Sequence, residues 1–140
     1  MKPIGILVAA TAFIFGGCTT ASVCGVVEDM RCQPIHNVMN APVIAPAGKI
    51  MSVDEVSKTI QRAGAALGWD MRPEAPGRIA GTLKLRTHVA IVDIEHDSKS
   101  YSIKYRDSSN LAANKGMIHR FYNGWIQHLN DGIQTQLKLP

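Results

Sequence analysis

The feature that most constrains the fold is a run between residues 78 and 106 in which apolar and polar side chains alternate. Ile79, Gly81 and Leu83 alternate with polar neighbours, and the same period of two recurs over 90–95 and 101–106. Successive side chains of a β-strand point to opposite faces, so the pattern predicts strands with one face on a core and one toward water. Turn residues interrupt it at 75–77, 86–88 and 97–100, which predicts a meander. A further short strand is expected over 69–72.

An amphipathic helix is expected just before these strands. Ser52 followed by Glu55 is a capping-box pair at the start of a helix. Gly68 fits the left-handed residue that often follows a helix end. The apolar side chains between them fall on one helical face, namely Val53, Val56, Ile60, Ala63 and Leu67.

A second helix is expected over 117–136, after the strands. Its predicted apolar face consists of Ile118, Phe121, Tyr122, Trp125, Leu129, Ile133 and Leu137. A helix, a set of antiparallel strands and a helix predict the α+β class, as a two-layer sandwich. We expect about four strands in one sheet, with the N-terminal and C-terminal helices on one face. The predicted core is Val56, Ile60, Leu67, Trp69, Ile79, Leu83, Val92, Ile94, Tyr101, Ile103, Tyr122, Trp125, Leu129 and Ile133.

The hairpin turn at Ser98 and Lys99 also predicts a strand register. It pairs Glu95 with Ser102, and Asp93 with Lys104. Both carboxylates then lie on the wet face beside basic residues. General acid–base catalysis needs a recess and a perturbed pKa, so we interpret the two acids as structural.

The first residues have the pattern of a secretion signal. Lys2 supplies a positive charge, residues 3–15 carry none, and two small residues, Gly16 and Gly17, precede Cys18. The uncharged stretch is shorter than the ~20 residues that a membrane-spanning helix needs. This pattern resembles the lipobox of bacterial lipoproteins, with Phe15 in place of the usual aliphatic residue. An ordinary secretory signal cut near residue 21 is the alternative.

That resemblance implies a signal peptide over 1–17 and a lipid-modified Cys18. A single acyl chain anchors a protein weakly and several chains anchor it firmly. In such lipoproteins an Asp after the cysteine retains the protein at the inner membrane, whereas Thr19 follows it here. The resemblance therefore implies an outer-membrane protein on the periplasmic side, with the membrane as its first partner.

Cys24 and Cys32 remain as an even pair once Cys18 is lipidated. In an oxidising compartment such a pair predicts a disulfide. Two free thiols are the alternative, and a metal site with His36 is weakly supported because there is no CxxC spacing. Residues 18–50, which include three prolines, predict a lipidated N-terminus and tether, although a short strand around 42–45 could dock on the domain. The folded domain is expected over 51–140.

No catalytic or cofactor motif is present in the sequence. The formal net charge is +4, too low for a typical nucleic-acid-binding domain, so no nucleic-acid partner is expected. The five histidines include no HExxH or other close pair, and no GxSxG, GxGxxG or phosphate loop occurs. We expect no metal, no cofactor and no enzyme activity.

The polar segment RDSSNLAANKG is the main candidate for ligand or partner contact. Polar loops often carry binding groups, and loop 107–116 leads into the aromatic helix. The candidate contact residues are Tyr105, Asp107, Asn110, His119, Arg120 and Tyr122. The structural alternative is a long connection held by side-chain turns and a helix cap.

The segments PGRIAGTL, YSIKYRDSSNL and IHRFYNGWIQHLNDGI together resemble small Gram-negative outer-membrane lipoproteins of unknown function. The resemblance covers about 53–133 and implies a fold and an address, but no catalytic residue. The favoured function is a non-enzymatic protein-interaction module bound to an unknown envelope protein. The alternative is a small-ligand or glycan-binding lipoprotein with loop 107–116 as its mouth. A hydrolase with a site built across elements is a third, weaker hypothesis.

Overall fold

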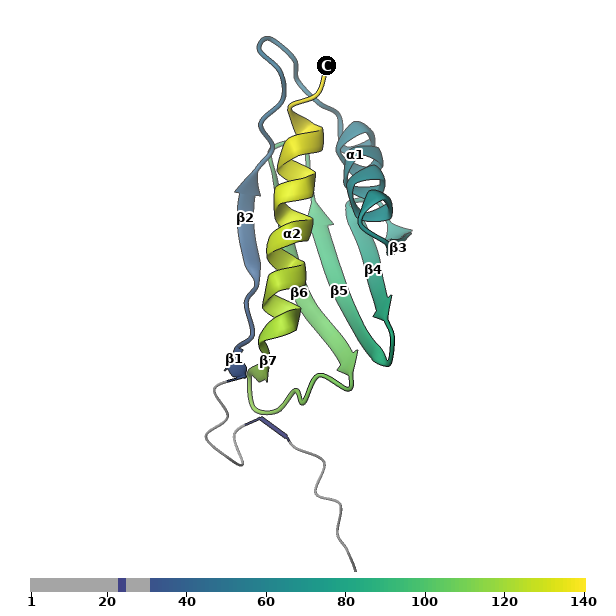
Figure 1. Cartoon of the computed structure of the whole chain (residues 1–140). Helices are drawn as coiled ribbons and strands as arrows, with labels where there is room; N and C mark the ends of the chain where they lie inside the picture. The colour runs from purple at the N-terminus through teal and green to yellow at the C-terminus, as the bar shows by residue number, and fades with distance from the viewer. Residues whose placement is uncertain (1–22, 25–30) are drawn as a thin grey trace, which may run out of the picture.

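The computed structural model describes Val23, Cys24 and residues 31–140 of the chain (Figure 1). The signal peptide and Cys18 lie outside these residues. Among the described residues, no helix is both long enough and apolar enough to cross a membrane. The elements in chain order are β1 (Cys32–Pro34), β2 (Val38–Pro42), α1 (Val53–Ala66), β3 (Trp69–Ala75), β4 (Arg78–Leu85), β5 (His88–His96), β6 (Ser100–Ser109), β7 (Met117–His119) and α2 (Arg120–Leu137).

The main sheet has five antiparallel strands in the order β2-β6-β5-β4-β3. Strands β3 to β6 form the predicted meander, and both helices lie on one face of it (Figure 1). The α+β class is therefore confirmed. The expected count of about four strands was too low, because β2 adds a fifth strand beside β6 and a separate two-stranded sheet joins β1 to β7.

The predicted hairpin register is also confirmed. Glu95 lies opposite Ser102, and Asp93 lies opposite Lys104. The β5–β6 turn is fixed by Asp97, whose Oδ1 accepts the main-chain amides of Lys99 at 2.7 Å and Ser100 at 2.8 Å. The side chain of Asp97 thus accepts hydrogen bonds from the main-chain amides of its own turn. This fixes the position of the turn, and with it the register of the two strands.

The capping box at the start of α1 occurs as predicted, and a glycine allows a close approach beside this helix. Ser52 Oγ accepts the amide of Glu55 at 3.2 Å, and Glu55 Oε2 accepts the amide of Ser52 at 2.8 Å. After the helix, Gly68 has a φ of +86°. A Cβ at Gly64 would lie 2.6 Å from the sulfur of Met71, so this glycine lets α1 pack directly on β3.

The core lies between the helices and the sheet. Most of the predicted core residues are buried, but Leu67 is 43% exposed and Trp125 is only partly buried. Leu67 follows the end of α1 and lies against Gly132 at the edge of α2. The buried hydrophobic residues that are absent from the predicted core are Cys24, Met51, Ala63, Ala80, Ala90, Leu111, Ile118, Ile126 and Leu137. Three of them, Ala63, Ile118 and Leu137, were on the predicted apolar faces of the helices.

The second helix begins three residues later than predicted. Residues 117–119 extend as β7 and pair with β1, so Ile118 is buried as a strand residue. The buried face of α2 is Tyr122, Ile126, Leu129, Ile133 and Leu137. Phe121, which we had placed on this face, is 49% exposed. The prediction was wrong here because it extended one helical phase through residues that are in a strand.

The folded unit takes in part of the segment that we assigned to a tether. Strands β1 and β2 come from residues 32–42, and the side chains of later elements hold them. Asn123 of α2 donates to the carbonyl of Pro34 at 2.9 Å and accepts the amide of His36 at 3.0 Å. Gln134 donates to the carbonyl of Pro42 at 3.1 Å. Residues 32–42 are therefore part of the folded unit.

Candidate functional site

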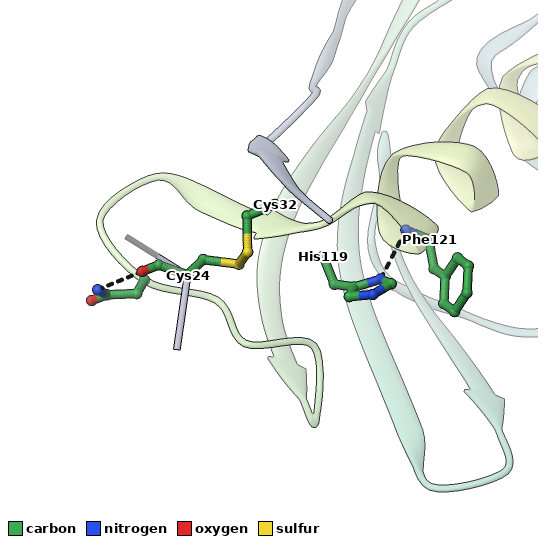
Figure 2. The surroundings of a disulfide bond; sticks show 5 residues. Cys24, Cys32, His119 and Phe121 are labelled. Carbon is green, nitrogen blue, oxygen red and sulfur yellow. Dashed lines mark hydrogen bonds between the residues drawn. A yellow bond between two sulfur atoms is a disulfide. The ribbon is translucent and has the colours of Figure 1, made fainter. Parts of the chain in front are cut away.

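The Cys24–Cys32 disulfide joins the N-terminal segment to the end of the domain where α2 begins. The two Cα atoms are 5.7 Å apart, and the bridge lies beside His119 (Figure 2). Cys24 is also held by its main chain. Its amide donates to the carbonyl of Ala112 at 2.9 Å, and Asn114 Nδ2 donates to its carbonyl at 2.9 Å. The chain is thus fixed to the domain at Cys24, six residues after Cys18.

The loop that was the predicted ligand mouth is held from both sides. Asp107 belongs to β6, pairs with Ile91, and accepts the amide of Ser108 at 2.8 Å. Asn110 has a φ of +58°. Its Nδ2 donates to Thr87 Oγ1 at 2.8 Å, and its carbonyl lies 2.8 Å from His88 Nδ1. Asn110 therefore ties the β4–β5 turn to the loop.

The two tyrosines of the predicted mouth pack on each other. The rings of Tyr105 and Tyr122 meet edge to face with centroids 5.5 Å apart. Tyr122 is fully buried, and within the described part of the chain its hydroxyl has no hydrogen-bond partner. Burial raises the pKa of this hydroxyl well above its usual value. The Tyr105 hydroxyl lies 2.8 Å from Ser108 Oγ. Tyr122 thus belongs to the core, and Tyr105, a residue of β6, packs against it.

His119 and Arg120 stand at the start of α2. His119 Nδ1 accepts the amide of Phe121 at 3.3 Å, so the imidazole caps the helix. Its ring lies 4.4 Å from the Phe121 ring, centroid to centroid. The Arg120 amide donates to the carbonyl of Arg31 at 2.7 Å, and its side chain is exposed. Three of the six predicted contact residues are exposed, namely Asp107, Asn110 and Arg120. Tyr122 is buried.

An exposed aromatic stripe on the first half of α2 was missed by the sequence analysis. It consists of Phe121, Gly124, Trp125 and His128, which we call the aromatic stripe. Residues at i, i+3, i+4 and i+7 share one face of a helix. Phe121 and His128 are exposed, and Trp125 is partly buried against the core, with its ring 6.3 Å from that of His88. A Cβ at Gly124 would meet nothing within 4 Å, so the backbone is open between the rings.

A shallow depression of about 460 Å³ accompanies the aromatic stripe. Gln33 of β1 also lines it, together with Asn123 and Arg120. Planar rings beside amide and guanidinium groups suit a partner that offers both apolar and polar surface. The sequence signal that could have identified this exposed face is the helical phase of α2. The predicted apolar face omits Ile126, whereas Ile126 is buried in the structure.

The outer face of the sheet carries a network of paired charges. Arg106 contacts both Glu74, at 2.7 Å, and Asp93, and Arg78 lies 3.5 Å from Asp93. The hydrogen bond from Arg106 is the main cause that lowers the pKa of Asp93. Although Lys104 is opposite Asp93 in register, its ammonium pairs with Glu95 at 2.8 Å. Carboxylates held ionised by arginine are poor proton donors at neutral pH, which agrees with a structural role for Asp93.

His96 is the buried polar side chain that is hardest to explain by structure alone. It is 8% exposed, and neither ring nitrogen has a hydrogen-bond partner among the described residues. It lines a small polar cavity of about 220 Å³ with Asn40, Glu95 and Ser102. Burial lowers the pKa of His96, so the ring is neutral at pH 7. Among the described residues, no group of three or more His, Cys, Asp or Glu side chains could hold a metal ion.

No protein family, curated protein or solved structure matches this chain.

Proposed function

We propose that the protein is an outer-membrane lipoprotein, anchored on the periplasmic side by Cys18, that binds another envelope protein without catalysing a reaction. The observation that carries the proposal is the aromatic stripe on α2. Exposed aromatic side chains are enriched at protein–protein contacts, and the tightest-binding residues there include Trp, Tyr and Arg. Here Phe121, Trp125 and Arg120 lie around one depression.

The anchor supports the same proposal from the other end of the chain. Lipidation at Cys18 would place the domain in the envelope, where a disulfide such as Cys24–Cys32 persists. The disulfide lies beside the start of α2 (Figure 2). The aromatic stripe would therefore be presented at a fixed place relative to the anchored segment, to a partner in or near the same membrane.

Site-specific crosslinking in living cells tests this function. A photoreactive residue at Phe121 or at His128 should give a discrete adduct, and the same residue at Arg72 on the outer face of β3 should give none. With the purified partner, Phe121→Ala and His128→Ala should each weaken binding by about 5- to 30-fold without changing stability, because both side chains are exposed. An adduct of twice the chain mass would identify a second copy instead. Equal adducts at all three positions would contradict a specific contact.

A small ligand or glycan is the alternative occupant of the same face. The observation that favours it is the pairing of ring faces, on Phe121 and Trp125, with the amide of Gln33 beside them. The mouth would then be this depression instead of loop 107–116, whose Asn110 is engaged with the β4–β5 turn. Chemical shifts that move at Trp125 on titration with envelope glycan fragments, with no crosslinked protein in cells, would favour this alternative.

A further inference from the structure

The end of the domain that holds Cys24 contains three segments joined by hydrogen bonds. Asn114 and Ala112, in the loop after β6, hold Cys24. Asn110, in the same loop, holds Thr87 of the β4–β5 turn. Strand β7 and the start of α2 complete this end (Figure 1). We call it the proximal end, because the chain toward Cys18 departs from it.

Four exposed cations lie on the proximal end: Lys84, Arg86, Lys115 and Arg120. Within the described residues, their side chains take part in no ion pair or hydrogen bond, in contrast to the paired Arg78, Lys104 and Arg106 on the sheet face. Asp107 lies close by, but its carboxylate accepts the amide of Ser108. The acidic residues Glu28 and Asp29 lie outside the described residues.

Apolar side chains accompany these cations. Leu85, at the end of β4, is 43% exposed, and Phe121, in the first turn of α2, is 49% exposed. Exposed leucine and phenylalanine among lysines and arginines suit the boundary between lipid headgroups and acyl chains. Lysines are depleted at protein–protein interfaces, so a surface with exposed lysines is less typical of a contact with a protein partner.

The length of chain before Cys24 limits how far this end can lie from an anchored Cys18. Cys24 lies six positions after Cys18, and six Cα-to-Cα steps span about 21 Å when the chain is fully extended. If Cys18 is lipidated, the proximal end therefore cannot leave the membrane surface by more than about the radius of a small domain.

From these observations we propose that the proximal end is a binding surface for anionic phospholipid. Lys84, Arg86, Lys115 and Arg120 contact lipid phosphates, and Leu85 enters the headgroup layer. The aromatic stripe then rises from the membrane along α2, toward the partner. The proposed orientation of the domain on the membrane depends on the proposed anchor at Cys18. The affinity of the proximal end for lipid does not depend on that anchor.

Vesicle sedimentation of residues 18–140 with Cys18→Ser, which have neither the apolar signal segment nor a lipid anchor, tests the surface by itself. Each basic residue near an anionic surface contributes about five-fold to binding. The triple variant Lys84→Gln/Arg86→Asn/Lys115→Gln should therefore bind vesicles of phosphatidylglycerol and phosphatidylethanolamine roughly 100-fold more weakly. Asn is chosen at position 86 because Arg86 has a φ of +54° and Asn tolerates that conformation.

The matched control removes three cations from the opposite end, as Lys58→Gln/Lys99→Gln/Lys138→Gln. It changes the net charge equally and should leave vesicle binding unchanged. Equal loss in the two triple variants, or equal binding to neutral phosphatidylcholine vesicles, would overturn the proposal, as would no binding by the parent chain. Failure here leaves the anchor at Cys18 intact, since the mass of the native protein reports lipidation separately.

Discussion

The main-chain amide of Cys24 donates a hydrogen bond to the carbonyl of Ala112, at 2.9 Å. This contact lies between residues 88 positions apart in the sequence. With the disulfide to Cys32, it fixes the chain to the folded domain well before the point where a Pro-containing tether would be expected to end. The position of the domain relative to any anchor at Cys18 is therefore set by a short segment.

Loss of the disulfide should lower stability by a measurable amount. The bridge closes a loop with a sequence separation of 8, for which the chain-entropy model gives roughly 2–3 kcal/mol. We expect Cys24→Ser/Cys32→Ser to lower the free energy of unfolding by about this amount, as measured by urea denaturation. Reductant should have the same effect on the parent and none on the variant. If reductant leaves the stability of the parent protein unchanged, the hydrogen bonds of Cys24 to Ala112 and Asn114 are sufficient to hold this segment without the disulfide.

The free energy of unfolding should fall as the pH drops below neutral, because of His96. An unfolded His binds a proton below a pH of about 6.5, whereas burial lowers the pKa of folded His96. The unfolded chain therefore binds more protons below pH 6.5, and stability is lost from there down to the folded pKa. Hydrogen bonds from the amides of Lys99 and Ser100 lower the pKa of the neighbouring Asp97, so its carboxyl does not titrate in this range.

The measurement is urea denaturation between about pH 7 and 5, which lies above the usual carboxylate range. In His96→Leu this part of the pH dependence should shrink, and stability at pH 7 should be retained because the side chain is buried without a hydrogen bond. An unchanged slope in the variant would assign the pH dependence to other groups.

Two buried tyrosines should respond to loss of the hydroxyl in opposite directions. The Tyr122 hydroxyl has no partner, so Tyr122→Phe should be neutral or stabilising by up to about 1 kcal/mol. The Tyr101 hydroxyl donates to Asn130 Oδ1 at 2.6 Å and accepts from Gln134 Nε2 at 2.9 Å. Tyr101→Phe should therefore destabilise by about 1–2 kcal/mol. Thermal unfolding compares the pair, and a larger loss for Tyr122→Phe would show that its hydroxyl has a partner in solution.

Asn110 should be sensitive to its replacement because its backbone is left-handed. At φ +58°, a Cβ-bearing residue without a polar side chain costs about 1 kcal/mol, and the lost bond to Thr87 adds a similar amount. Asn110→Ala should therefore lower stability by about 2 kcal/mol and Asn110→Gly by less. Equal Tm values for Asn110→Ala and the parent would leave Asn110 free for a ligand role.

The parts of the fold that local chemistry specifies were predictable. The alternation from 78 to 106 predicted β4, β5 and β6, and the turn at Ser98 and Lys99 predicted the register of β5 with β6. The capping box located the start of α1. In each case the residues that determine the structure are neighbours in sequence, so the pattern contains the information.

The parts that depend on distant contacts were not predictable. Strands β1 and β2 have no alternation, and they are held by Asn123 and Gln134, about ninety residues away. The suggested strand around 42–45 therefore lies over Val38–Pro42 instead. Phe121 and Trp125 were placed on the apolar face of the helix because the pairing of Met117–His119 with Cys32–Pro34, which delays the start of α2, has no local signature.

The most direct test of the account is the intact mass of the protein extracted from the membrane, with and without reductant, beside a Cys18→Ser control. The account predicts a chain that begins at Cys18, bears acyl groups, and gains the mass of two hydrogens when Cys24 and Cys32 are reduced. An unmodified chain that begins near residue 22 would contradict it, because no anchor would then hold the proximal end at a membrane.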